Sequence, residues 1–193
     1  MRSFLPESGT LDMFARLLEY PRGEEAGIAA KGAAALSGET PEAASLLGET
    51  RAFFADTPRG RVEEVFTATF DLQATCAPYL GFHLFGEGYK RRIFLAGLSA
   101  IYSSRGFPIG GELPDHIAVV LRFLAKSGAD GPTREILLDG LIPALAKMIG
   151  KFGDAGNPYG NVLRALQLVL LPARPADTTE ALRGQSGTEV GPP

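Results

Sequence analysis

The sequence is poor in the features that several classes of protein require. Its single cysteine, Cys76, excludes an intramolecular disulfide framework and a cysteine-based zinc site. No window approaches the roughly 20 apolar residues of a membrane span, and the first ten residues lack the apolar run of a signal peptide. The net charge of −3 gives no general basis for nucleic-acid binding. We therefore expect a cytoplasmic protein with no nucleic-acid partner and no stable membrane insertion.

Motifs of common catalytic sites are missing as well. The chain has neither a G-x-S-x-G nucleophile turn nor a G-x-x-x-x-G-K-[ST] phosphate loop. Gly81, Gly86 and Gly88 do not fit a dinucleotide-binding fingerprint, and Cys76 has no histidine at a diagnostic spacing. The residues themselves thus give little support to nucleophilic catalysis.

Apolar residues recur at helical spacing along most of the chain, and no strand-like alternation persists. The stretch from Val62 to Phe70 shows the i, i+3, i+4, i+7 pattern of an amphipathic helix. We expect Pro143 to kink or divide its helix, because proline lacks an amide hydrogen. Other helices are expected to start near Thr10, Thr40-Pro41, Thr57-Pro58, Tyr89, Pro114, Pro132 and Asn157-Pro158, with a weak helix within residues 23–38.

These patterns predict an all-α protein. A chain of 193 residues with 45% hydrophobic residues fits one domain with a sizeable core. We expect a single-domain helical bundle of about eight to ten helices over residues 1–171. Residues 172–193 contain almost no large apolar side chain, so they are predicted to form a disordered C-terminal tail.

Two segments, residues 70–92 and 111–125, hold both histidines, the cysteine and the densest basic cluster. Imidazoles and carboxylates suit a divalent metal, and five residues here could supply them: His83, Glu87, Glu112, Asp115 and His116. His83 and Glu87 would share a face if their segment is helical. The simpler interpretation places Glu112 and Asp115 at a helix N-terminus and makes His116 a hydrogen-bonded packing residue. The basic cluster at residues 90–92 could attract an acidic group or form a solvated helix face.

Four motifs occur in order along the chain: RLLEYP at residues 16–21, FD at 70–71, HLFGE at 83–87 and ELPDH at 112–116. With them the chain resembles the nitrate reductase delta-subunit family, the NarJ-type assembly chaperones of the TorD/DmsD group. The resemblance implies a TorD/NarJ-like all-helical fold and no catalysis. It implies a partner too, the N-terminal peptide of the catalytic subunit of a nitrate reductase or related molybdoenzyme. That subunit would be held ready for insertion of the molybdenum cofactor and for assembly. The cofactor would belong to the client, with none bound tightly by this chain.

Carried over residue by residue, the resemblance gives these candidates for client-peptide binding: Asp71, Tyr79, His83, Phe85, Glu87, Glu112, Asp115 and His116. Phe85 departs from the polar residue that some members have after the histidine. A client groove needs apolar walls and a few polar groups, and the segment from Tyr79 to Phe85 can supply the walls. The acids would attract a basic peptide. We expect the fold to bring the two segments together around one groove.

Two other interpretations remain open at this point. One is a metal-dependent hydrolase that uses His83, Glu87, Asp115 and His116. The other is a helical adaptor with no role in enzyme maturation.

Overall fold

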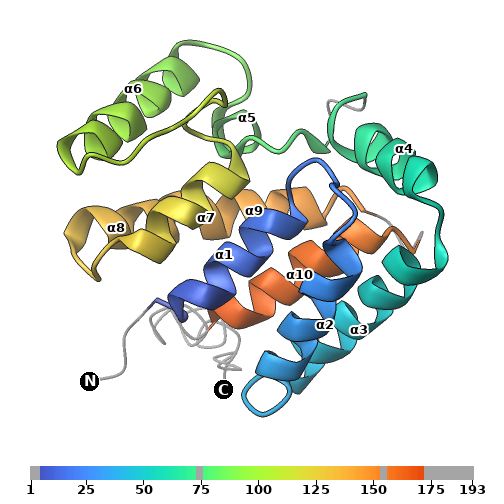
Figure 1. The fold of residues 1–193 in the computed structure, drawn as a ribbon. Helices are drawn as coiled ribbons and strands as arrows, with labels where there is room; N and C mark the ends of the chain where they lie inside the picture. The colour runs from blue at the N-terminus through green and yellow to red at the C-terminus, as the bar shows by residue number, and fades with distance from the viewer. Residues whose placement is uncertain (1–4, 73–75, 153–155, 172–193) are drawn as a thin grey trace, which may run out of the picture.

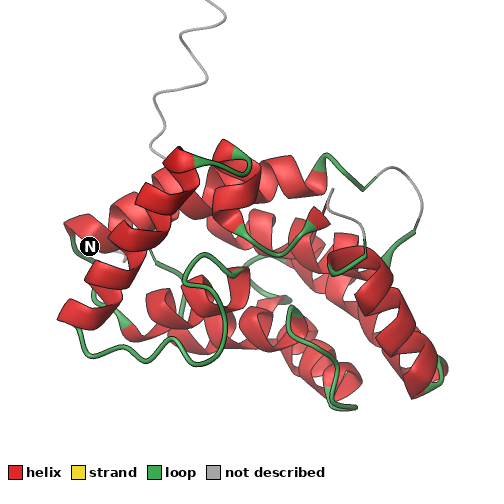
Figure 2. Cartoon of the chain, turned by 90° about the horizontal axis from the view of Figure 1, so that it is seen from above, coloured by secondary structure: helices red, strands yellow, loops and turns green. Residues whose placement is uncertain are grey.

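The computed structural model describes residues 5–72, 76–152 and 156–171, and every regular element within these ranges is helical (Figure 2). This confirms the predicted all-α fold. The elements in order are α1 (Ser8–Leu17), α2 (Glu25–Leu36), α3 (Pro41–Asp56), α4 (Arg59–Phe70), α5 (Leu80–Phe85), α6 (Tyr89–Ser104), α7 (Ile117–Lys126), α8 (Gly131–Glu135), the π-helix η2 (Ile136–Leu141), α9 (Ile142–Ile149) and α10 (Pro158–Leu170). The predicted tail, residues 172–193, lies outside the described residues.

Two of the three start signals in which a capping residue directly precedes a proline were right to the residue, and at Thr57-Pro58 the helix α4 begins one residue later, at Arg59. α3 begins at Pro41, and α10 begins at Pro158, where Asn157 Oδ1 accepts a hydrogen bond from the Tyr159 amide at 2.9 Å. The weak helix expected within residues 23–38 is α2. The start expected at Thr10 is wrong, because α1 already begins at Ser8. The start expected at Pro114 is also wrong, since α7 begins three residues later.

The centre of the fold is built from α7 and α10, which bury most of their side chains. α3 packs against both α2 and α10, and α1 lies against α7 and α2 (Figure 1). An aromatic cluster fastens α4 to this core, because the Phe66 ring lies 5.0 Å from Phe70 and 5.5 Å from both Tyr20 and Tyr159, between ring centres. Phe66 is buried, as its position on the amphipathic pattern predicts.

Pro143 divides its helix, as expected. The six residues before α9 form η2, in which the Ile142 amide donates to the Leu137 carbonyl five residues back. Proline cannot donate the next amide and crowds the preceding turn, and a local π-turn adapts the helix to both effects.

α5 and α6 lie at the edge of the fold (Figure 1). α5 packs against α9 and α6, whereas the sixteen-residue α6 buries only Leu98 and Tyr102. None of the described helices combines the length and the apolar character that a membrane crossing requires.

Candidate functional site

The two motif-bearing segments meet in space through the backbone. The Leu80 amide donates to the Asp115 carbonyl at 2.9 Å, and the Ile117 amide donates to the Pro78 carbonyl at 2.8 Å. These bonds form an isolated antiparallel bridge between Tyr79 and His116, whose rings pack edge to face at 5.5 Å. That residues 70–92 and 111–125 meet is confirmed, whereas the client groove expected between them stays a prediction. We call this junction the motif corner.

Asp115 is the buried centre of the motif corner. Its side chain is 0% exposed, and Oδ2 accepts hydrogen bonds from the Gly81 amide at 3.1 Å and from Arg91 Nε at 3.2 Å. The carboxylate therefore joins the first turn of α5 to the first turn of α6. The prediction that it would serve the helix following it in sequence is wrong, because Asp115 lies in a turn, His116 forms the extended bridge, and α7 starts only at Ile117.

Gly81 is required by this contact. A Cβ atom at position 81 would lie 2.8 Å from Asp115 Oδ2, 3.0 Å from Phe94 and 3.1 Å from the Arg91 side chain. Glycine thus lets the carboxylate approach the backbone of α5. Sequence reasoning missed both Gly81 and Arg91 as parts of the site.

His116 is buried, and its Nδ1 accepts a hydrogen bond from the Ala118 amide at 3.2 Å. It therefore caps α7, in keeping with the simpler interpretation of a hydrogen-bonded packing residue. Burial lowers the pKa of its imidazole, while the charges of Glu112, Glu19 and Asp115 act in the opposite direction.

His83 is half-buried at the other side of the corner. Its Nε2 donates to the Ala77 carbonyl at 2.7 Å, and its own carbonyl accepts from Lys147 Nζ at 3.0 Å. Burial lowers the pKa of His83, and Lys151 and Lys147 lower it further, against the effect of the bond to Ala77.

Glu87 does not share a helix face with His83, because no helix includes both residues. α5 ends at Phe85, and Gly86 takes a φ of 66°, which turns the chain away. Within the described ranges, no three His, Cys, Asp or Glu side chains gather as they would around a metal ion. The structure therefore does not favour the metal-dependent hydrolase.

The surface next to the corner is acidic and partly apolar. Asp71, Glu87 and Glu112 are exposed, Phe85 is exposed, and Tyr79 is half-buried. Burial raises the pKa of the Tyr79 hydroxyl, and the charges of Glu112, Asp115 and Asp71 raise it further. Among the residues that the resemblance predicts to bind a client peptide, we call Asp71, Tyr79, Phe85, Glu87 and Glu112 the client-facing surface.

The basic cluster at residues 90–92 fills both of its predicted roles, since one residue binds an acidic group and the other two form a solvated helix face. Arg91 turns inward to Asp115, and its guanidinium lies 5.4 Å from the centre of the Tyr79 ring. Lys90 and Arg92 are exposed.

The first motif also reaches this region. Arg122 of α7 forms an ion pair with Glu19 of RLLEYP, in which Nη2 lies 2.6 Å from Oε2. This hydrogen bond is the main cause that raises the pKa of Arg122. The segments that contain three of the four motifs, RLLEYP, HLFGE and ELPDH, are thus joined by contacts between residues far apart in the chain.

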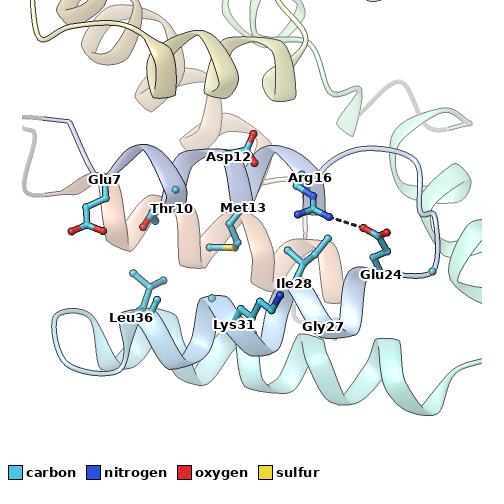
Figure 3. Close-up of a pocket in the computed structure, with 14 residues that line it drawn as sticks. Glu7, Thr10, Asp12, Met13, Arg16, Glu24, Gly27, Ile28, Lys31 and Leu36 are labelled. Atoms are coloured by element: carbon cyan, nitrogen blue, oxygen red, sulfur yellow. Dashed lines mark hydrogen bonds and ion pairs between the residues drawn. The ribbon is translucent and has the colours of Figure 1, made fainter.

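A separate groove of about 730 Å³ lies between α1 and α2 (Figure 3). Met13 points from α1 toward α2, and Ile28 and Leu36 point back from α2. An ion pair of 2.6 Å between Arg16 and Glu24 joins the two helices at one end. Sequence reasoning did not anticipate this groove. The signal available for it was the glycine- and alanine-rich composition of residues 23–38, whose small side chains leave room between the helices.

Comparison with known proteins agrees with this structure. The family described as nitrate reductase delta subunit matches residues 34–152, a range that includes all eight candidate site residues. A crystal structure from Archaeoglobus fulgidus, described as a redox enzyme maturation protein, superposes with a TM-score of 0.58 and 20% identity. The match covers 84% of this chain and 93% of the other, and at this identity it shows the fold alone. No curated protein matches the chain. The chain therefore belongs to the nitrate reductase delta-subunit family, whose members are chaperones of redox-enzyme maturation and not enzymes.

Proposed function

We propose that this chaperone binds the N-terminal region of the catalytic subunit of a respiratory nitrate reductase in the cytoplasm. It holds that subunit ready for insertion of the molybdenum cofactor and for assembly with its partner subunits. The observation that supports this proposal is the backbone bridge at the motif corner, because it joins the two segments that carry the exposed acids Glu87 and Glu112. The molybdenum cofactor belongs to the client in this proposal, and the chaperone binds none tightly.

The eight candidate residues divide into two roles. Asp115 and His116 are buried, so in this conformation they act on a peptide only through the residues that they position. The client-facing surface makes the direct contacts, and His83 supports it through the hydrogen bond to the Ala77 carbonyl.

The client peptide that fits this surface is basic and partly apolar. Asp71 and Glu112 attract cationic side chains and speed association, because exposed charges act over about 8–10 Å at physiological salt. Phe85 and the edge of Tyr79 offer apolar contact, which supplies affinity once the peptide has arrived.

The direct test is calorimetric titration with a synthetic peptide that covers the N-terminal region of the nitrate reductase catalytic subunit from the same host. The double variant Asp71→Asn/Glu112→Gln should bind roughly three- to thirtyfold more weakly, since two exposed charge contacts are lost. Circular dichroism and melting should stay unchanged, because both side chains are exposed. A matched control, Glu39→Gln/Glu42→Gln, removes two exposed acids, one just before α3 and one in its first turn, and should bind like the wild type.

The difference between the Asp71/Glu112 variant and the wild type should shrink as salt is raised. Failure of the wild type to bind the peptide, or equal binding by the variant, would overturn the proposal.

The cofactor step has its own test, which is the molybdenum content of the catalytic subunit purified from a host that lacks the chaperone. We expect it to fall and to be restored by the wild-type chain. Full molybdenum content without the chaperone would contradict that step.

A further inference from the structure

The two oxygens of the buried Asp115 carboxylate are used unequally. Oδ2 accepts hydrogen bonds from both the Gly81 amide and Arg91 Nε, at 3.1 and 3.2 Å. Oδ1 is buried as well, and no described residue donates a hydrogen bond to it. A guanidinium can bond to both oxygens of a carboxylate through two parallel N–H groups, which is the strongest form of this contact. Arg91 makes only part of that contact, so Asp115 retains an acceptor for a better donor.

Arg91 belongs to the less firmly packed half of α6. None of the residues 89–97 is buried, and the two buried anchors of the helix, Leu98 and Tyr102, follow them. The Arg91 side chain is itself 15% exposed. A long, unbranched side chain at the edge of the fold can leave a carboxylate by changing rotamer, without disturbing the buried anchors.

The charges that act on the Tyr79 hydroxyl are mostly negative. Burial raises the pKa of this hydroxyl, the charges of Glu112, Asp115 and Asp71 raise it further, and Arg91 lowers it. One cation thus acts there against three carboxylates, and Glu112 and Asp71 are exposed to solvent. This part of the motif corner therefore attracts a further cation.

The exposed charges at the start of α6 do not reverse this balance. Lys90 and Arg92 flank Arg91 in the sequence, and Glu87 precedes the helix; all three are exposed. With them, four carboxylates stand against three cations, so the net charge around Tyr79 and the first turn of α6 stays negative.

We propose that Arg91 is an internal substitute for an arginine of the client. It occupies Asp115 in the free chaperone, and on binding a client guanidinium replaces it and bonds to both carboxylate oxygens. This inference rests on the proposed function and adds a means of selection at the same site. A lysine or a small cation cannot use both oxygens in this planar geometry, so it gains little by displacing Arg91.

The first test uses the synthetic peptide of the client N-terminal region and a matched peptide in which every arginine is lysine. The charge is the same in both. Calorimetry should show that the wild-type chaperone binds the lysine peptide about tenfold or more weakly. Against Asp115→Asn the difference between the peptides should shrink below about threefold, because an amide offers only one acceptor oxygen. Asp71→Asn/Glu112→Gln is the control: it weakens both peptides and should keep the full difference between them.

The second test removes the internal competitor. Arg91→Gln should bind the arginine peptide at least about fivefold more tightly than the wild type, because the peptide no longer displaces a side chain from Asp115. A merely structural Arg91 predicts the opposite, since its loss would loosen the corner and weaken binding. Urea unfolding shows whether the variant is folded. Arg91→Lys is the milder variant, and it should also bind more tightly than the wild type because an ammonium competes less well for the carboxylate.

The outcomes separate this inference from the function on which it rests. If the wild type binds neither peptide, the proposed function fails and the inference fails with it. If the wild type binds both peptides equally, or if folded Arg91 variants bind no more tightly than the wild type, the role of Arg91 is overturned while the proposed function stands. An arginine preference that Asp115→Asn leaves intact would also overturn it.

Discussion

Replacing Asp115 with alanine should destabilise the protein strongly, because this carboxylate holds three segments together. It accepts from the Gly81 amide of α5 and from Arg91 of α6, and its own residue pairs in the backbone bridge. The bridge itself survives the substitution, since it uses main-chain atoms. The decrease in the free energy of unfolding therefore comes from the loss of the two side-chain contacts.

The magnitude follows from burial. Losing a hydrogen bond to a charged group costs about 1.5–3 kcal/mol, and breaking a buried ion pair from one side costs about 3–5 kcal/mol. The two costs overlap, because both arise from the same Oδ2 atom. Arg91 is 15% exposed and keeps its contact with the Tyr79 ring, which lessens the cost of leaving it unpaired. We expect the free energy of unfolding to fall by about 3–4 kcal/mol.

Urea unfolding followed by circular dichroism measures this change. Asp115→Asn keeps an acceptor for the Gly81 amide and should cost about 1–2 kcal/mol less than alanine. A double-mutant cycle of Asp115→Asn with Arg91→Gln should give a coupling energy above about 0.5 kcal/mol, since the two side chains are in contact. A loss below about 1 kcal/mol for Asp115→Ala would refute the argument, because it would mean that the carboxylate is solvated or that α6 does not depend on it.

The same corner has a consequence for the proposed client. Asp115→Ala combined with His116→Ala should weaken binding of the client N-terminal peptide roughly ten- to a hundredfold, because the client-facing surface loses its support. A melting curve must accompany the titration, since both changes also weaken helix starts. Wild-type affinity in a folded double variant would show that ELPDH is a structural corner only.

Three further predictions concern stability. Phe66→Ala should lower the free energy of unfolding by about 3–5 kcal/mol, since the ring is buried among aromatic side chains, and a loss below about 1 kcal/mol in urea unfolding would mean that α4 does not pack as described. Gly81→Ala should cost about 1–3 kcal/mol by the same assay, because its Cβ would press on Asp115, and an unchanged midpoint would show that α5 shifts freely. Burial lowers the pKa of His83 and His116 below the ordinary 6.5, so the unfolded state takes up protons first as the pH falls. The melting temperature should therefore drop between about pH 7 and pH 5, and a His83→Gln/His116→Asn variant should show a flatter dependence over that window.

Most helices could be predicted from the sequence because their signals are local. Helical spacing of apolar residues predicts the helix over residues 89–104, and a capping signal predicts the helix that starts at Asn157-Pro158. Both signals depend on contacts within a few residues, and both predictions match the structure. The order of four motifs was likewise sufficient to indicate the family, since it depends only on the chain itself.

The candidate site could be predicted only in outline. That residues 70–92 and 111–125 would meet was expected, but the partners of their side chains were not. Asp115 reaches an amide 34 positions away, and Arg91 turns inward while both its neighbours stay exposed. Local patterns carry no information on such contacts. A contact between distant residues depends on the path that the chain takes between them.

The sequence by itself therefore determined the helices and the family, because short-range hydrogen bonding and apolar periodicity are read from neighbouring residues. Only the tertiary structure decided that Asp115 serves α5 and not the helix after it, and that Tyr89 and Ile93 of α6 are exposed to solvent. It also decided that a groove opens between α1 and α2. The physical reason is that burial and the pairing of distant donors with acceptors arise from packing between helices, which fixes their relative positions once the local structure has formed.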